Sequence, residues 1–184
     1  YGDDHLGIIL TVGSYLKETG KMDFLKEEMP FYVAGKKRKD RPKGTVLEHL
    51  KRALKFTREH LGKHNLPLLG FADWNDCMNL PLGAESTFNT ALYAKALLEM
   101  MDIEEALGDK KAVEMYKGWY EDVKAAFNKS AWDGKWWTRW FDKDGNGYGD
   151  YEFDGVVYDN LLGWVKAVVD SVTGLEFGDE DLGT

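Results

Sequence analysis

Apolar residues recur at helical spacing in several long segments of the chain. The first follows Asp3 and Asp4 and ends before Gly20. Its apolar residues, which follow a helical period, are Leu6, Ile8, Ile9, Leu10, Val12, Tyr15 and Leu16. Acidic residues suit the positive end of a helix dipole, and glycine is a common helix terminator. The pattern predicts a helix from about residue 4 to 19.

Three further helices are predicted by their capping residues. Thr45-Val46-Leu47-Glu48 has the form of a capping box, and an apolar stripe continues from it to Gly62. Glu85-Ser86-Thr87 caps a third helix that runs to Gly108, and Asp109 then caps a fourth that carries apolar residues to Phe127. Helices joined alternately by short turns and long loops indicate antiparallel helical hairpins rather than a βαβ chain.

The remaining segments predict smaller elements. Residues 22–33 suggest a short helix that ends near Pro30. Aromatic residues flank Asp133-Gly134 between residues 131 and 141, which is the signature of a short β-hairpin. The pattern returns to a helix from about residue 158 or 160 to Val172, and we expect the acidic tail 176–184 to fray.

A basic loop lies between residues 36 and 43. Its cations are Lys36, Lys37, Arg38, Lys39, Arg41 and Lys43. One interpretation is a patch for an anion or a phosphate group. The interpretation that we favour is a solvated surface insertion, because no aromatic residues interleave the cations and Gly and Pro mark the segment as a loop.

Composition narrows the class of protein. The 184 residues, 43% of them hydrophobic, are enough for one globular domain with a substantial core. A net charge of −8 argues against nucleic acid as a partner. The sequence holds no apolar run long enough to cross a membrane, and its start lacks the features of a signal peptide.

The single cysteine, Cys77, excludes an internal disulfide bond and fits a reducing compartment, so we expect a cytoplasmic protein. Cys77 could serve as a nucleophile, but no histidine is near it in the sequence, and a free buried thiol is the favoured interpretation.

Candidate chemistry is concentrated in the stretch from Gly70 to Asn79, which reads Gly-Phe-Ala-Asp-Trp-Asn-Asp-Cys-Met-Asn. Prolines flank the stretch, which makes a loop between helices the expected structure. Its two carboxylates, its indole and its amides suit a sugar, because carboxylates bind hydroxyls or donate a proton and an aromatic face covers the apolar side of a pyranose. The alternative is a helix N-cap followed by a buried Trp.

A second motif resembles a calcium-binding EF-hand loop. Asp142, Asp144, Asn146 and Asp150 fall at its ligand positions, but Phe153 stands where a bidentate Glu is required. We therefore favour a Gly/Asp turn and expect no metal.

Four landmarks in order resemble the cellobiose/chitobiose phosphorylase family of glycoside hydrolases. Asp3-Asp4-His5-Leu6 is similar to the family's Ser-Asp-Asp-His-Leu-Trp segment, with Gly7 in place of Trp. Ala72 to Asn79 resembles its Gly-Asp-Trp-Asn-Asp-Gly loop, and Gly83-Ala84-Glu85-Ser86 its Gly-x-Glu-Ser motif. Ala131 to Trp136 resembles its Ala-Trp-Asp-Gly-Glu-Trp hairpin.

The resemblance implies a mainly α fold in which residues 1–184 are one domain, part of an (α/α)6 toroid, with the 70–79 loop at the mouth of the barrel. It implies reversible, inverting phosphorolysis of a β-linked disaccharide, with inorganic phosphate as co-substrate and no cofactor. Carried over by position, Asp76 is the general acid. The substrate-binding candidates are Trp74, Asp73, Asn75 and Glu85. Asp73 would bind a hydroxyl, orient the loop, or raise the pKa of Asp76 by like charge.

The match is to the central portion of the family's barrel, so we expect the residues that bind phosphate and the donor sugar to lie outside this chain. Part of a toroid leaves apolar helix faces uncovered, and we expect a second copy or a complementing segment to cover them. Two alternatives stay open: an inverting glycoside hydrolase on the same barrel, and an inactive sugar-binding or structural fragment.

Overall fold

The computed structural model describes residues 2–75, 80, 82–132, 134 and 137–148. Asp76, Cys77 and Asp150 lie outside the described residues. The predicted helix near 158–172 and the tail 176–184 also lie outside them.

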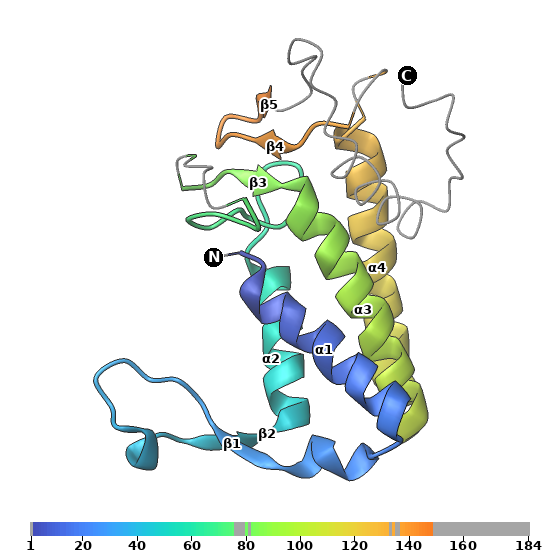
Figure 1. Ribbon diagram of the computed structural model, residues 1–184. Coiled ribbons are helices and arrows are strands. Elements are labelled where there is room, and N and C mark those ends of the chain that lie inside the picture. The colour runs from blue at the N-terminus through green and yellow to red at the C-terminus, as the bar shows by residue number, and fades with distance from the viewer. Residues whose placement is uncertain (1, 76–79, 81, 133, 135–136, 149–184) are drawn as a thin grey trace.

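Four helices dominate the described chain, as the apolar pattern predicts. They are α1 (Asp4–Thr19), α2 (Val46–Glu59), α3 (Thr87–Leu107) and α4 (Lys110–Ser130). Helices α3 and α4 form an antiparallel hairpin, and α1 and α2 pack against α3 (Figure 1). Large side chains without solvent exposure fill the space between them. Among these are Leu6, Ile9, Leu50, Leu54, Tyr93, Leu97 and Met100.

The ends of the helices follow from local chemistry. Thr45 and Glu48 form the predicted capping box, with the Thr45 amide donating to Glu48 Oε2 over 2.6 Å and the Glu48 amide donating to Thr45 Oγ1 over 3.1 Å. Asp109 caps α4 by accepting from the Ala112 amide at 3.0 Å. Gly108 ends α3 with a φ of 80°, a left-handed conformation that favours glycine. The tight α3–α4 connection is therefore encoded by two adjacent residues.

Residues 22–33 differ from the prediction of one short helix. Met22–Lys26 is a 3₁₀ turn, η1, and Glu28–Pro30 is a strand, β1. Strand β1 pairs antiparallel with β2 (Lys43–Thr45). The prediction fails because a residue before proline prefers extended backbone, and because the pairing partner lies 15 residues or so further along the chain.

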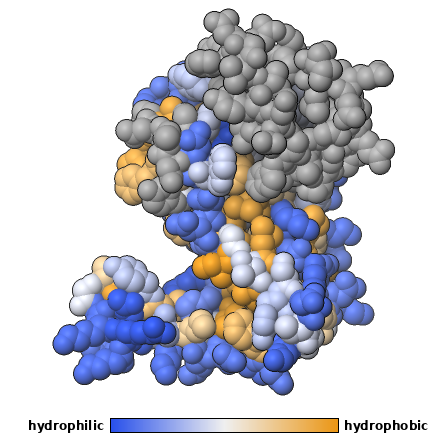
Figure 2. All heavy atoms as spheres, in the orientation of Figure 1, coloured by the Kyte–Doolittle hydropathy of each residue, from blue (hydrophilic) through white to orange (hydrophobic). Residues whose placement is uncertain are grey.

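The basic segment between β1 and β2 forms an arm that projects from the helices (Figure 1). A short 3₁₀ turn, η2 (Arg38–Asp40), lies within it. The guanidinium of Arg41 covers the ring of Tyr32 at 4.7 Å, and Arg41 Nε donates to the Lys36 carbonyl. The arm is strongly hydrophilic in Figure 2, as expected of a surface insertion.

A small sheet lies at the opposite end of the helices from the arm (Figure 1). It has the order β3-β4-β5, made of Glu85–Ser86, Trp140–Phe141 and Gly147–Tyr148. In the predicted 131–141 hairpin, one antiparallel bridge joins Trp132 and Trp137. Its last two residues form β4, which pairs with β5 across the predicted Gly/Asp turn.

Several large apolar side chains remain exposed on the helices. Ile8 on α1 is 57% exposed, Phe56 on α2 49% and Met115 on α4 43%. Figure 2 shows apolar residues gathered over the middle of the helices on one face. Within the part of the chain that the structure describes, we find no helix with the length and apolar character of a membrane span.

Candidate functional site

The candidate site is built where loops meet at one end of the helices. The N-terminal ends of α1 and α3 lie at this end, together with the three-stranded sheet (Figure 1). The Gly2 amide donates to the Ala72 carbonyl at 3.0 Å, and the Leu69 amide donates to the Ala84 carbonyl at 2.8 Å. The loop that begins at Gly70 is thus tied to the start of the chain on one side and to the segment before α3 on the other.

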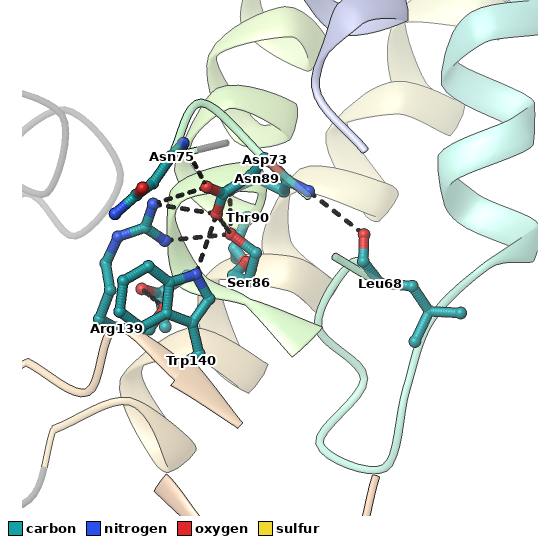
Figure 3. Close-up of polar contacts among 9 residues, drawn as sticks. Leu68, Asp73, Asn75, Ser86, Asn89, Thr90, Arg139 and Trp140 are labelled. Carbon is teal, nitrogen blue, oxygen red and sulfur yellow. Dashed lines mark hydrogen bonds and ion pairs between the residues drawn. The ribbon is translucent and has the colours of Figure 1, made fainter. Parts of the chain in front are cut away.

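Asp73 is the most heavily bonded side chain of this loop (Figure 3). It is 1% exposed. The Asn75 amide donates to its Oδ1 at 2.9 Å, which makes an Asx-type turn. The Ser86 hydroxyl donates to its Oδ2 at 2.5 Å and the Trp140 indole donates to the same oxygen at 3.2 Å.

Arg139 completes the set of donors to Asp73. Its Nη2 lies 3.0 Å from Oδ1 and 2.9 Å from Oδ2, while its Nη1 donates to the Ser86 hydroxyl oxygen at 3.2 Å. Burial lowers the pKa of the Arg139 guanidinium, and the Asp73 carboxylate opposes that shift. Both oxygens of Asp73 are therefore engaged by protein donors, and its negative charge is offset by the cation beside it.

This geometry bears on two of the roles predicted for Asp73, orienting the loop and binding a sugar hydroxyl. A carboxylate held by the chain's own donors orients the loop, whereas a hydroxyl of a sugar would have to displace one of them. Arg139 lies against the Asp73 carboxylate, so the expected like-charge effect on Asp76, which lies outside the described residues, stays a prediction.

Trp74 lies immediately after the buried Asp73 and is 62% exposed. Its ring centroid is 6.3 Å from that of Phe88 at the start of α3, with an interplanar angle of 31°. The exposed indole contradicts the alternative in which an N-cap precedes a buried Trp. Asn75 is half-buried beside it. The next residue, Asp76, lies outside the described residues.

Glu85 holds a different loop, that of residues 62–66. It has no solvent exposure. Its Oε1 accepts from the amides of His64 at 2.9 Å and Leu66 at 3.1 Å, and its Oε2 lies 2.6 Å from His64 Nδ1. The carboxylate of Glu85 therefore supports the backbone behind the site, and its assignment to sugar binding stays a prediction.

Two residues at the start of α1 also reach this region. Burial raises the pKa of the Asp3 carboxyl, and the neighbouring Asp4 and Asp73 carboxylates add to the effect. His5 Nε2 lies 2.7 Å from Thr57 Oγ1, and its ring meets Phe56 edge-on. Burial lowers the pKa of the His5 imidazole, and its contacts to Thr57 and Phe56 make it a packing residue between α1 and α2.

The EF-hand look-alike forms the turn between β4 and β5. Asp142 Oδ1 accepts from the amides of Asp144 at 2.9 Å and Asn146 at 2.8 Å, and Oδ2 accepts from the Asn146 side chain at 2.8 Å and the Tyr148 hydroxyl at 3.1 Å. These bonds are those of the predicted Gly/Asp turn. No group of three or more acidic, His or Cys side chains with metal-binding geometry occurs among the described residues.

Sequence reasoning missed Arg139 and Trp140 as members of the site. They contact Asp73 across 66 and 67 positions of sequence, and neither has a local motif that points to that contact. The available signal was the position of the cation Arg139 directly before two large aromatic residues, Trp140 and Phe141, both of which are buried in β4.

Comparison with known proteins gives the family. Residues 1–162 match the model of the glycosyl hydrolase 94 superfamily, catalytic domain. The chain belongs to this superfamily. The catalytic domain of the superfamily is an (α/α)6 barrel, so the four helices are part of such a toroid, and the predicted resemblance is confirmed.

Two of the relatives that the chain matches are named as phosphorylases. The chain is 34% identical over 152 residues to N,N'-diacetylchitobiose phosphorylase of Vibrio furnissii, which covers 82% of the chain and 18% of the relative. It is 32% identical over 169 residues to solabiose phosphorylase of Paenibacillus borealis, which covers 89% of the chain and 21% of the relative. The chain therefore spans about a fifth of the length of these relatives.

Proposed function

We propose that this chain carries the general-acid loop of an inverting disaccharide phosphorylase. In the proposed reaction Asp76 protonates the glycosidic oxygen of a β-linked disaccharide. The bond from that oxygen to the anomeric carbon breaks, and inorganic phosphate forms a new bond from the opposite face. The products are an α-sugar 1-phosphate and the free acceptor sugar. In the reverse direction the Asp76 carboxylate takes the proton from the acceptor hydroxyl.

The observation that carries this proposal is that the Asp73 carboxylate is buried and fully hydrogen-bonded by protein donors. A hydrolase that inverts configuration needs a second carboxylate to activate water. Asp73 is the nearest described carboxylate in the loop sequence, but its oxygens are engaged by Ser86, Arg139 and Trp140 and its exposure is 1%. With Asp73 engaged in this way, Asp76 is the other acid of the 70–79 sequence, and one acid suits a reaction in which phosphate replaces the activated water. The phosphorylase names of the relatives support the same choice.

Trp74 is the proposed sugar contact. Its indole is 62% exposed and directly follows the buried Asp73 in the chain. It therefore presents a flat apolar surface to solvent, two residues before the proposed acid in the sequence. Carbon-bound hydrogens of a pyranose pack on such a face. Asn75, half-buried, is the proposed hydrogen-bonding neighbour, and Glu85 contributes through the loop that it holds. We also retain the expectation of a cytoplasmic protein, on the single cysteine.

The proposal is tested by following sugar 1-phosphate release in the full-length protein. Cellobiose, laminaribiose and N,N'-diacetylchitobiose are each incubated with and without phosphate. We expect turnover of one of them only when phosphate is present, and a loss of at least about 100-fold in kcat for Asp76→Asn. Asp144→Asn, an exposed acid in the β4–β5 turn, is the matched control and should retain activity.

Three outcomes would contradict the proposal. Release of free sugars alone, independent of phosphate, indicates a hydrolase. Calorimetric binding of a disaccharide without turnover under either condition indicates a sugar-binding segment. Full activity of Asp76→Asn would remove the general-acid assignment.

A further inference from the structure

Arg139 differs from the other arginines of the described chain in how completely it is fixed. Its side chain is 11% exposed. The guanidinium lies 4.3 Å from the centroid of the Trp140 ring and 5.2 Å from that of Phe88. It also makes hydrogen bonds to both oxygens of Asp73 and to Ser86 (Figure 3). A planar guanidinium that contacts two aromatic rings and is paired with a carboxylate has little freedom to reorient.

The backbone of Arg139 is fixed as well. Its amide donates to the Tyr148 carbonyl at 3.0 Å. Its carbonyl accepts from the Thr87 amide at 3.2 Å and from the Thr87 hydroxyl at 2.9 Å. Strand β5 and the first turn of α3 therefore hold the residue from both sides. Because its backbone is held by β5 and α3, Arg139 can keep the group that its guanidinium binds at a defined position relative to these two elements.

What the guanidinium binds is the anchor of the site loop. Asp73 Oδ1 accepts from Arg139 and also from the Asn75 amide at 2.9 Å. The same carboxylate oxygen thus joins Arg139 to the backbone just beyond Trp74. Phe88, which Arg139 covers, also lies beside Trp74, at 6.3 Å between ring centroids. Two contact routes, one ionic and one aromatic, lead from Arg139 to the Trp74–Asn75 segment.

We propose that Arg139 is a positioning residue that, through Asp73 and Phe88, fixes the Trp74–Asn75 segment for sugar binding. This inference rests on the proposed function. Arg139 itself touches no reacting atom in it. Its contribution is the pre-organisation of the loop, and a displacement of about 1 Å in such a segment costs on the order of 100-fold in rate.

The test compares Arg139→Met and Arg139→Lys with a matched control, Arg58→Met, in the full-length protein. Arg58 is also paired with a carboxylate, Asp122 at 2.6 Å, and also lies over an indole, that of Trp119 at 5.7 Å. It joins α2 to α4 and has no contact with Asp73. Substitution by Met removes the same charge and the same stacking group at both positions.

The first readout is native-state amide hydrogen exchange, which does not depend on activity. Arg139→Met should accelerate exchange of the Asn75 amide at least tenfold relative to amides within α3, such as that of Leu97. Arg58→Met should leave that ratio unchanged. A residue that served stability alone would accelerate the Asn75 and Leu97 amides together.

The second readout is catalysis and binding. Arg139→Met should lower kcat about 100-fold for phosphorolysis and weaken disaccharide binding, with Arg139→Lys intermediate because it keeps the charge but not the two-pronged geometry. Equal exchange ratios, or equal kcat and disaccharide affinity, in Arg139→Met and Arg58→Met overturn the inference.

The two proposals fail separately. Persistent turnover in Asp76→Asn refutes the proposed function. An inactive Asp76→Asn together with an unaffected Arg139→Met refutes only the role of Arg139. If the wild-type protein binds a disaccharide without turnover, the exchange ratio and the affinity decide the matter for Arg139.

Discussion

Glu85 and Ser86 are neighbours in strand β3, and their side chains hold two different loops. Successive residues of a strand point to opposite faces. The Glu85 carboxylate accepts from the backbone of His64 and Leu66, while the Ser86 hydroxyl donates to Asp73 and accepts from the Asn89 amide as the N-cap of α3. A two-residue strand thus aligns the 62–66 loop, the loop that begins at Gly70 and the first turn of a long helix.

The Asp73–Arg139 pair should be costly to break. Asp73→Asn keeps the shape of the side chain but leaves the buried guanidinium without its counter-charge, so we expect a loss of about 3–5 kcal/mol in the free energy of unfolding. Denaturant titration measures it. Asp122→Asn, which removes the partially exposed partner of Arg58, should cost under about 1 kcal/mol. Equal costs for the two variants would show that the Asp73 pair is no more than a surface contact.

Trp74 should contribute to substrate binding rather than to stability. Because the indole is 62% exposed, Trp74→Ala should change the melting temperature little but raise the KM for the disaccharide about tenfold, which is about 1.4 kcal/mol. Tyr32→Ala, which removes a 78% exposed ring on the arm, is the control and should leave KM unchanged. An unchanged KM in Trp74→Ala would remove Trp74 from the sugar site.

Gly62 should not tolerate a larger residue. A β-carbon at this position would lie 2.3 Å from Glu85 Cγ and 2.6 Å from Glu85 Cδ. Because Glu85 is fixed by three contacts to the same loop, we expect Gly62→Ala to destabilise the fold by about 1–3 kcal/mol. Gly118→Ala, at a position in α4 with open space around it, should instead be neutral or stabilising by up to about 1 kcal/mol. Thermal unfolding of the two variants compares them directly.

The β4–β5 turn should depend on the ionisation of Asp142. Hydrogen bonds from Asn146, Tyr148 and Asp144 lower the pKa of this carboxyl from 3.8 to about 2. A pKa that is lower in the folded state stabilises the turn above the ordinary value, and this contribution is lost as the pH falls from 3.8 through about 2. NMR titration of the carboxyl carbon should give a midpoint near the lower value.

Asn146→Ala provides the control for that titration, because it removes the side-chain donor to Asp142 Oδ2 and keeps the backbone donor. Its midpoint should move up toward the ordinary value. A wild-type midpoint already near 3.8 would contradict the hydrogen-bonded turn.

The helices could be predicted from the sequence because their determinants are local. The Thr45–Glu48 box, Asp109 and the left-handed Gly108 act within four residues of the helix ends that they define, and the apolar spacing fixes which face is buried. The arm could not be predicted in the same way. Strand β1 has three residues and includes Pro30, and its extended form depends on pairing with β2 across the whole basic segment.

The candidate site also has a part that local sequence predicts and a part that depends on distant residues. Its loop, and the presence of acids and an aromatic residue in it, follow from Pro, Gly and composition between residues 70 and 79. The different environments of Asp73 and Trp74 do not, because the burial of Asp73 depends on Ser86, Arg139 and Trp140 from two later elements. Asp73 is buried and Trp74 is exposed because residues from these later elements cover one and not the other.

The pairing of Glu28 with Thr45 places the two ends of the arm side by side. The backbone therefore leaves the helices and returns to them at nearly the same place. Because the two ends of the arm are adjacent, the number of residues between them is not set by a distance that the arm must span. Closing a flexible loop costs little more as it lengthens, about 0.6 kcal/mol per doubling. This position is therefore a natural site for insertion or deletion, where residues 31–42 could be replaced by a tight turn while α2 keeps its start at Val46.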